Sequence, residues 1–169
     1  MASLLLAVIY LAFIGLGLPD SLLGSGWPVM HEELGAPLSA MGLISMIIAA
    51  GTVVSSLASD FLTRKLGTGL VTFISVLMTA GAMLAFSFAR TYWLLCVLAV
   101  PYGLGAGGVD AALNNYVALY YKSRHMSWLH CFWGVGALIS PFIMSYALAG
   151  GGGWGAGYSL VSYIQFGLC

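Results

Sequence analysis

Residues 92–121 read YWLLCVLAVPYGLGAGGVDAALNNYVALYY, an apolar stretch whose one charged side chain is Asp110. A helix of about 20 apolar residues crosses a hydrocarbon core of roughly 30 Å. Lipid offers no hydrogen-bond partners, so the backbone at that depth must pair with itself, and a helix does so within one segment. The stretch therefore predicts a membrane-spanning helix over Tyr92–Tyr121 that carries a carboxyl group at membrane depth.

The composition of the whole chain excludes a soluble domain. Of its 169 residues, 61% are hydrophobic and 6% are charged, whereas about 25% of the residues of a soluble domain are charged. Five basic and five acidic residues leave no net charge, which argues against nucleic-acid binding. Cys96, Cys131 and Cys169 are odd in number and far apart, so neither a disulfide framework nor a metal site is expected. The lipid bilayer is the expected partner, and no cofactor is indicated.

Charged residues and turn signals divide the chain into six predicted membrane spans. These spans are expected at Ser3–Met30, Leu38–Leu62, Gly69–Ala89, Tyr92–Tyr121, Met126–Ala149 and Trp154–Cys169. The first span is too long for a signal-peptide core and lacks a basic segment before it, so it is expected to stay in the membrane. The fold class is therefore an all-α membrane protein in which neighbouring helices pack antiparallel through short connections.

The basic residues predict the orientation of the chain in the membrane. Arg64 and Lys65 lie in the second connection, and Lys122 and Arg124 lie in the fourth, on the same side. Only Arg90 lies on the other side. Because cytoplasmic loops carry an excess of basic residues, we expect a multi-pass protein of the cell membrane with both termini in the cytoplasm.

Two parts of the chain resemble each other. Gly-Leu-Gly at 15–17 precedes Asp20, and Gly-Leu-Gly at 103–105 precedes Asp110, an offset of about 88 to 90 residues. An offset of three helices places the second copy upside down relative to the first. Many secondary transporters are built from such inverted repeats, so the pattern predicts a 3+3 inverted repeat.

One domain is expected over the whole chain, residues 1–169. It would consist of two three-helix repeats, at about 1–90 and 91–169. The last span, Trp154–Cys169, is short, so the chain is expected to end inside or barely across the membrane. A truncated gene, a deliberately shortened protein and a natural half-size protein would each explain that ending.

Asp20 and Asp110 are the most informative residues. A charge in mid-bilayer costs about 2.5–3.5 kcal/mol on insertion scales, so such residues usually face a cavity and serve function. A medium of low dielectric favours the neutral carboxyl group, which makes both residues candidates for proton exchange. Pro19 is expected to loosen the helix beside Asp20. The alternative is a structural carboxyl group that is hydrogen-bonded to a neighbouring helix.

Further polar and aromatic side chains are candidates for contact with a solute. Asn114 lies one helical turn after Asp110, next to Asn115, and His130 lies on the following span. His130 can relay protons or bind a hydroxyl group, and a packing role is equally compatible. Trp27 has two interpretations, a residue of the interfacial aromatic belt, which is favoured, or a stacking surface at the rim of a cavity.

Enzymatic signals are weak. Gly103–Gly108 reads GLGAGG and matches GxGxxG literally, but a phosphate cradle needs a preceding strand and a helix N-terminus. Proteolysis by Asp20 and Asp110 is conceivable, although their repeat-related positions suit a transporter better. No catalytic residue is assigned, and an enzyme is not expected.

Residues 56–65, SLASDFLTRK, resemble the cytoplasmic loop signature of the major facilitator superfamily. The resemblance implies that Asp60 pairs with Arg64 and Lys65 as a gate that latches neighbouring helices in one access state. Such transporters have twelve helices, and the resemblance covers only the amino-terminal six-helix half.

Within this superfamily the chain is similar to the fucose:proton symporter branch. The similarity rests on Asp20, on residues 110–117 (DAALNNYV) and on residues 130–137 (HCFWGVGA). The glycines after Gly-Pro that mark antiporters are missing after Ser140-Pro141, which disfavours drug/proton antiport.

The resemblance implies proton-coupled transport of a small polar solute, with a sugar as one candidate, by alternating access. Asp110 would be the leading proton-coupling site with Asp20 beside it, while Asn114, Asn115 and His130 would bind the solute. A homodimer or a second half would complete the transporter. Two alternatives stay open: a half that does not transport, kept as a folding or interaction module, and a passive pore formed by an oligomer.

Overall fold

A computed structural model describes the backbone of residues 2–169 and the side chains of residues 4–169. Met1, with which the predicted domain begins, lies outside the described residues. The elements in chain order are α1 (Ala2–Asp20), α2 (Leu22–Glu33), the short 3-10 helix η1 (Leu38–Ala40), α3 (Met41–Leu66), α4 (Thr68–Ser87), α5 (Tyr92–Tyr120), α6 (Ser123–Ala149) and α7 (Gly153–Leu168). Residues 2–169 contain no strand, so the predicted all-α class is confirmed.

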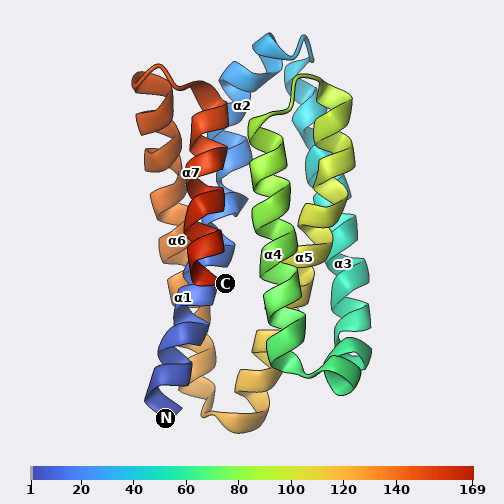
Figure 1. Ribbon diagram of the computed structural model, residues 1–169, viewed down its shortest axis with the longest axis vertical. Coiled ribbons are helices and arrows are strands. Elements are labelled where there is room, and N and C mark those ends of the chain that lie inside the picture. The colour runs from blue at the N-terminus through green and yellow to red at the C-terminus, as the bar shows by residue number, and fades with distance from the viewer. Residues whose placement is uncertain (1) are drawn as a thin grey trace.

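Within the part of the chain that the structure describes, five segments are long and apolar enough to cross a membrane. They are Leu4–Glu33, Leu38–Leu66, Thr68–Ser87, Tyr92–Tyr120 and Ser123–Ala149. The sixth predicted span corresponds to α7, which has 16 residues and ends part of the way along the bundle (Figure 1).

The first span is broken into two helices at the predicted position. α1 ends at Asp20, Ser21 forms a turn, and α2 begins at Leu22. Pro19 has no N–H to donate to the carbonyl of Gly15, four residues earlier, and its ring crowds that carbonyl. The break leaves Asp20 at the end of a helix inside the membrane span.

Two predicted connections were too long. Arg64 and Lys65 belong to the last turn of α3, and Arg124 belongs to the first turn of α6. The turn after α3 needs only Gly67, which adopts a positive φ of 81°, so the preceding residues can stay helical. Basic side chains also interact favourably with the carbonyl end of a helix, which suits Arg64 and Lys65.

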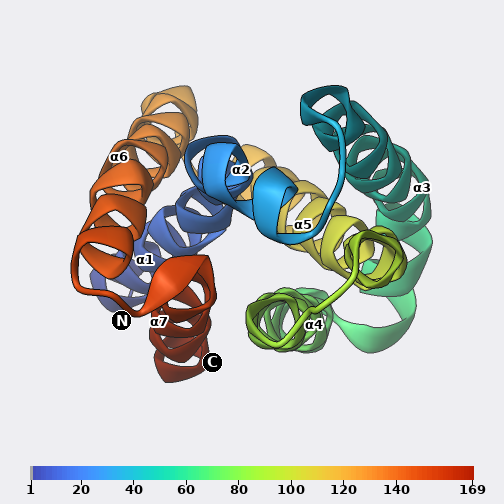
Figure 2. The same cartoon turned by 90° about the horizontal axis from the view of Figure 1, so that it is seen from above.

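Viewed along the bundle, α1, α6 and α7 lie on one side, α3, α4 and α5 lie on the other, and α2 lies between them (Figure 2). The main packing pairs are α3 with α5, α1 with α6, α4 with α5, and α4 with α7. The N-terminus and the α3–α4 and α5–α6 connections lie at one end (Figure 1). The four basic residues in or next to these connections therefore share that end, and Arg90, between α4 and α5, lies at the other.

The core consists of two hydrophobic clusters. One gathers around α2, α4, α5 and α7 and contains the buried side chains of Trp27, Phe86 and Tyr158. The other gathers around α1, α5 and α6 and contains Phe13 and Leu129. Along α1 the change from one cluster to the other comes just before Asp20.

Glycines set the closest helix–helix contacts. A Cβ atom on Gly17 would collide with the Trp133 carbonyl, and one on Gly136 would collide with the Ile14 carbonyl, so α1 and α6 cross backbone to backbone. The GLGAGG stretch packs in the same way: a Cβ atom on Gly107 would collide with the backbone of Thr52 on α3. Small residues that let backbones approach are typical of helix packing in membranes, which explains this stretch without a nucleotide.

Candidate functional site

Asp20 joins three helices. Its Oδ1 accepts a hydrogen bond of 2.8 Å from the hydroxyl of Tyr102 on α5. Its Oδ2 accepts one of 2.8 Å from the indole N–H of Trp133 on α6. Both donors are directed at the carboxyl group of Asp20, and hydrogen bonds to a carboxyl group are about twice as strong when it is ionised as when it is neutral. The end of α1 is thereby linked to α5 and α6.

Asp20 also lines a partly open cavity of about 290 Å³. This volume lies just below the range of about 300–1,000 Å³ that is typical of ligand pockets. The polar groups of its wall are Asp20, Ser45, Tyr102 and Tyr158. The rest of the wall is formed by Pro19, Leu23, Gly24, Met41, Ile48, Ala49, Met83 and Phe86.

Asp110 lies apart from the wall of this cavity. Its Oδ1 accepts a hydrogen bond of 2.9 Å from the side-chain amide of Asn114. His130 on α6 is exposed, and its ring centre lies 6.3 Å from that of Phe13 on α1. The structure therefore brings the predicted Asp110 and Asn114 into contact, and it leaves Asn115 exposed on the outer surface of α5.

Trp27 is buried, with 2% of its surface exposed. Its indole N–H donates a hydrogen bond of 2.8 Å to the Leu38 carbonyl, and its ring meets Tyr92 at 6.4 Å between centroids. It is not among the residues that line the 290 Å³ cavity. Trp27 thus holds the linker between α2 and α3, a structural role that neither sequence interpretation included.

The predicted gate residues lie on one helix. Asp60 and Arg64 form an ion pair one turn apart on α3, with 63% and 75% of their side chains exposed. The Lys65 ammonium lies 4.4 Å from the centre of the Phe61 ring. In this structure the ion pair does not connect α3 to a neighbouring helix.

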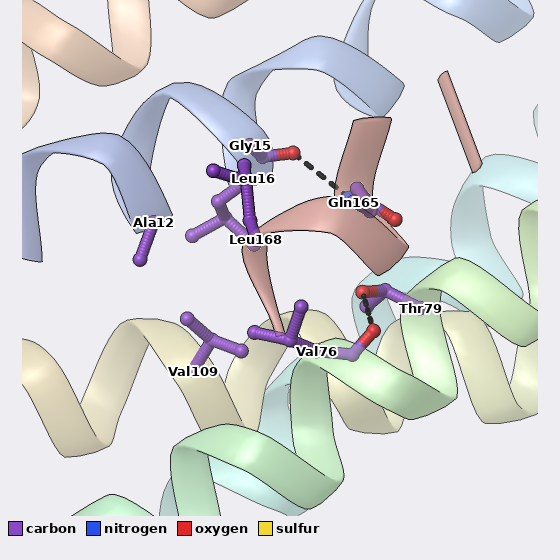
Figure 3. A pocket seen from close by; sticks show the side chains of 8 residues that line it. All are labelled: Ala12, Gly15, Leu16, Val76, Thr79, Val109, Gln165 and Leu168. Atoms are coloured by element: carbon purple, nitrogen blue, oxygen red, sulfur yellow. Dashed lines mark hydrogen bonds between the residues drawn. The ribbon is translucent and has the colours of Figure 1, made fainter. Parts of the chain in front are cut away.

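A second cavity lies between α1, α4, α5 and α7 (Figure 3). At about 20 Å³ it has room for about one water molecule, so it is not a solute site. Gln165, 2% exposed, donates a hydrogen bond of 2.8 Å from Nε2 to the carbonyl of Gly15 (Figure 3). Pro19 has no N–H to donate to this carbonyl, so Gln165 on α7 supplies the hydrogen bond that the helix lacks at this position.

Three residues that line the two cavities were not identified from the sequence. Tyr102 and Tyr158 carried no signal in an apolar segment, and Gln165 was not singled out as a polar residue at membrane depth. The pairing of Pro19 with a polar side chain elsewhere could have pointed to Gln165, because a proline in a membrane helix demands a substitute donor.

Comparison with known proteins places the chain in a family. The sequence profile described as Major Facilitator Superfamily matches residues 9–168. Human synaptic vesicle glycoprotein 2B is 25% identical over 156 residues, which cover 90% of this chain and 23% of that protein. Mouse sodium-dependent glucose transporter 1A is 24% identical over 141 residues, which cover 82% of this chain and 33% of that protein. The chain thus spans about a quarter to a third of the length of these relatives, and it belongs to the major facilitator superfamily of membrane transporters.

Proposed function

We propose that this chain is the amino-terminal half of a proton-coupled transporter for a small polar solute, with a sugar as the leading candidate. The observation that carries the proposal is the position of Asp20. This carboxyl group stands at a helix break, lines a cavity of ligand size and accepts hydrogen bonds from two other helices. Titratable groups at membrane depth that face a cavity mark ion and substrate pathways.

The hydrogen bonds of Asp20 offer a mechanism of coupling. Tyr102 and Trp133 donate to a carboxylate, and protonation removes the negative charge that strengthens both bonds. Binding of a proton would therefore loosen the link from α1 to α5 and α6. Alternating access requires such a change in helix contacts at the site.

Asp110 is the second proposed proton-coupling site. Asn114 donates a hydrogen bond to it, and His130 on the following helix would be its partner in proton exchange. Asn114 has a buried side-chain oxygen without a hydrogen-bond partner among the described residues, which can accept a bond from a solute hydroxyl. Asn115, exposed on the same helix, would contact the solute from the face that meets the second half.

The packing supports two inverted repeats. G-x-G-x-x-D occurs at 15–20 and at 105–110, an offset of 90 residues. Gly15 packs against α7 and Gly105 packs against α4, and each of these is the third helix of the other repeat. Gly17 packs against α6 and Gly107 packs against α3, and each of these is the second helix of the other repeat. Equivalent positions therefore make equivalent contacts, as a pseudo-two-fold axis requires.

The assembly and the gate belong to the same proposal. A second half or a second copy of this chain would cover the exposed side of α1, α5 and α6 and complete a central cavity. At the end that carries the basic residues, Asp60, Arg64 and Lys65 would form a gate once the second half is present. That end would face the cytoplasm, with the protein in the cell membrane.

Sodium is the alternative to the proton as the coupling ion. Two relatives are named sodium-dependent glucose transporters, and a carboxylate such as Asp20 can accept sodium as well as a proton. The similarity to the fucose:proton symporter branch favours the proton. A non-transporting half and a passive pore are further outcomes that the same measurement can reveal.

Uptake into proteoliposomes tests the proposal. Radiolabelled D-glucose and L-fucose would be offered under an inward proton gradient, under a sodium gradient and without a gradient. We expect uptake that saturates and follows the proton gradient, and we expect Asp20→Asn and Asp110→Asn to abolish the dependence on the gradient with expression intact. Glu32→Gln, an exposed residue near the end of α2, is the control.

Each other outcome contradicts a stated part of the proposal. Coupled uptake that survives both substitutions would remove the assigned roles of Asp20 and Asp110. A response to sodium alone would replace the proton, and flux that does not saturate would indicate a pore. Native mass spectrometry in nanodiscs would add the assembly: a dimer supports transport by two copies, and a monomer without uptake indicates a half that needs a partner.

A further inference from the structure

An open cavity of about 420 Å³ lies between α1 and α6, at the end of the bundle where the N-terminus lies (Figure 1). It is lined by Tyr10 on α1 and by Arg124, His125, Trp128 and Phe132 on α6. The volume falls within the range of about 300–1,000 Å³ that is typical of ligand pockets. None of these side chains has a role in the proposed transport, so the cavity is a candidate for a separate site.

The hydrogen bonds of His125 leave free donors in this cavity. A guanidinium group has no acceptor, so Arg124 Nε–H donates to His125 Nε2, at 3.5 Å. A neutral imidazole that accepts at Nε2 carries its hydrogen on Nδ1, and Nδ1 therefore donates to the hydroxyl oxygen of Tyr10, at 2.7 Å. The hydroxyl hydrogen of Tyr10 and the terminal N–H groups of Arg124 are then free to bind a ligand.

No carboxylate of the described residues neutralises these donors. The one ion pair in that part of the chain joins Asp60 to Arg64 on α3. The other acidic residues lie at membrane depth or near the opposite end of the bundle, and they are Asp20, Asp110, Glu32 and Glu33. A set of donors with a positive charge selects an anion, and a guanidinium group matches the oxygens of a phosphate in particular.

The face of α6 that carries Arg124 continues as a stripe of apolar and aromatic side chains. Steps of three or four residues keep side chains on one face of a helix. From Arg124 such steps lead to the exposed or half-buried residues of the α6 stripe, which are Trp128, Phe132, Val135, Ile139, Phe142 and Tyr146. At 3.6 residues per turn, His130 lies on nearly the opposite face of α6, which is the face proposed to meet the solute. The α6 stripe is therefore left to the acyl chains of the bilayer, with Arg124 at its aqueous end.

We propose that this cavity binds the headgroup of an anionic phospholipid whose acyl chains lie along the α6 stripe. Arg124 binds the phosphate oxygens, Tyr10 donates its free O–H, and Trp128 lies at headgroup level, where tryptophan gathers in membrane proteins. Basic pockets between membrane helices hold anionic headgroups in this way. A site without a carboxylate offers no partner to the cationic group of a zwitterionic lipid, and the stripe favours a lipid over a free phosphate ion.

Native mass spectrometry of the purified 169-residue protein in detergent tests this site. Phosphatidylglycerol is titrated into the wild-type protein, Arg124→Gln and Lys122→Gln, and the Kd of the first bound lipid is measured. Both substitutions remove one positive charge at the same end of the bundle, but Lys122 is not among the residues that line the cavity. We expect Arg124→Gln to raise the Kd about tenfold, equivalent to about 1.4 kcal/mol. Lys122→Gln, the matched control, should bind within about twofold of the wild type.

Tyr10→Phe tests the free hydroxyl group. The substitution removes the O–H and keeps the ring, which stacks on Phe132 at 4.7 Å between centroids. We expect the Kd for phosphatidylglycerol to rise about threefold, because a neutral donor contributes less than the guanidinium group. Tyr163→Phe, at a position on α7 with 61% of its surface exposed, should bind like the wild type. Circular dichroism without added lipid checks that each variant is folded, and unchanged binding by folded Tyr10→Phe would overturn the assigned set of donors.

Three further results would overturn the lipid site. Equal weakening by Arg124→Gln and Lys122→Gln would indicate a general attraction to positive charge rather than a defined cavity. Phosphatidylcholine that binds as tightly as phosphatidylglycerol would contradict selection of an anionic headgroup. Displacement of the lipid by millimolar glycerol 3-phosphate would show that a free phosphate fills the cavity without the α6 stripe. The measurement needs neither uptake nor a proton gradient, so its outcome is independent of the proposed transport.

Discussion

The hydroxyl of Tyr102 and the carboxylate of Asp20 are 82 residues apart in sequence and form a hydrogen bond of 2.8 Å. This bond connects the break between α1 and α2 to the interior of α5. Pro19 cannot donate a helical hydrogen bond to the Gly15 carbonyl, and Gln165 on α7 donates to that carbonyl instead, while α5 and α6 hold the side chain of Asp20. The broken helix is therefore stabilised by its neighbours at the point where the cavity begins.

Tyr102→Phe should destabilise the protein. Tyr102 is buried with 3% of its surface exposed, and hydrogen bonds to charged groups contribute about 1.5–3 kcal/mol to folding stability. Unfolding in detergent, followed by circular dichroism, should show a loss of that size. Tyr163→Phe should change the free energy of unfolding by less than about 0.5 kcal/mol, as is usual for surface positions. Equal stability of the two variants would contradict the importance of the Asp20 bond.

Gly136→Ala and Gly134→Ala should have opposite effects, although both lie on α6. The added methyl group of Gly136→Ala meets the Ile14 carbonyl, while nothing lies within 4 Å of the position that a Cβ atom on Gly134 would take. Overpacking costs about 1–3 kcal/mol, whereas relief of the low helix propensity of glycine gains up to about 1 kcal/mol. Thermal unfolding of the two variants in the same detergent measures the difference. Similar melting temperatures would mean that α1 and α6 do not cross as closely as described.

Trp154→Phe should loosen the end of the bundle opposite the N-terminus. The Trp154 indole donates a hydrogen bond of 2.6 Å to Glu33 Oε2 and so ties α7 to the end of α2. Loss of a bond to a charged acceptor should cost about 1.5–3 kcal/mol. Hydrogen exchange of residues 30–40, measured by mass spectrometry, should become faster. Trp93→Phe, at a position that is 71% exposed, should leave exchange there unchanged, and the same increase in both variants would refute a specific tie.

Asp60→Asn should lower the rate of uptake without changing the free energy of unfolding. Exposed ion pairs one helical turn apart contribute only about 0.3–0.5 kcal/mol, so the unfolding free energy should barely change. If Asp60 acts in a gate, the uptake rate should fall severalfold in the assembled transporter at unchanged stability. Uptake and unfolding are measured on the same preparation. Unchanged uptake would assign the Asp60–Arg64 pair to the surface of α3 and nothing more.

Cysteine labelling from one side should report the orientation of the chain. In a variant with Cys96, Cys131 and Cys169 replaced by alanine, Lys122→Cys should react with a membrane-impermeant maleimide only after the cells are opened. Arg90→Cys should react in intact cells, because the two positions lie at opposite ends of the bundle. The reverse pattern would place the N-terminus outside.

The membrane spans were predictable from sequence because hydrophobicity is a local property of the chain. The broken first helix was also predictable, since the geometry of Pro19 restricts its own turn whatever surrounds it. The ends of α3 and α6 were placed less well, because charged residues mark the water boundary but do not end a helix. Asp20 and Asp110 were recognisable because any carboxyl group at that depth requires an explanation.

Only the tertiary structure decided which side chains are in contact with one another. Tyr102, Trp133, Tyr158 and Gln165 come from three different helices and look like ordinary span residues in the sequence. Their contacts depend on how each helix is rotated about its axis and on how closely the backbones approach, as at Gly17 and Gly136. Rotation and approach result from packing over the whole bundle, and no single segment encodes them. The sequence therefore determined that carboxyl groups lie at membrane depth, and the tertiary structure determined their hydrogen-bond partners and the cavity that Asp20 faces.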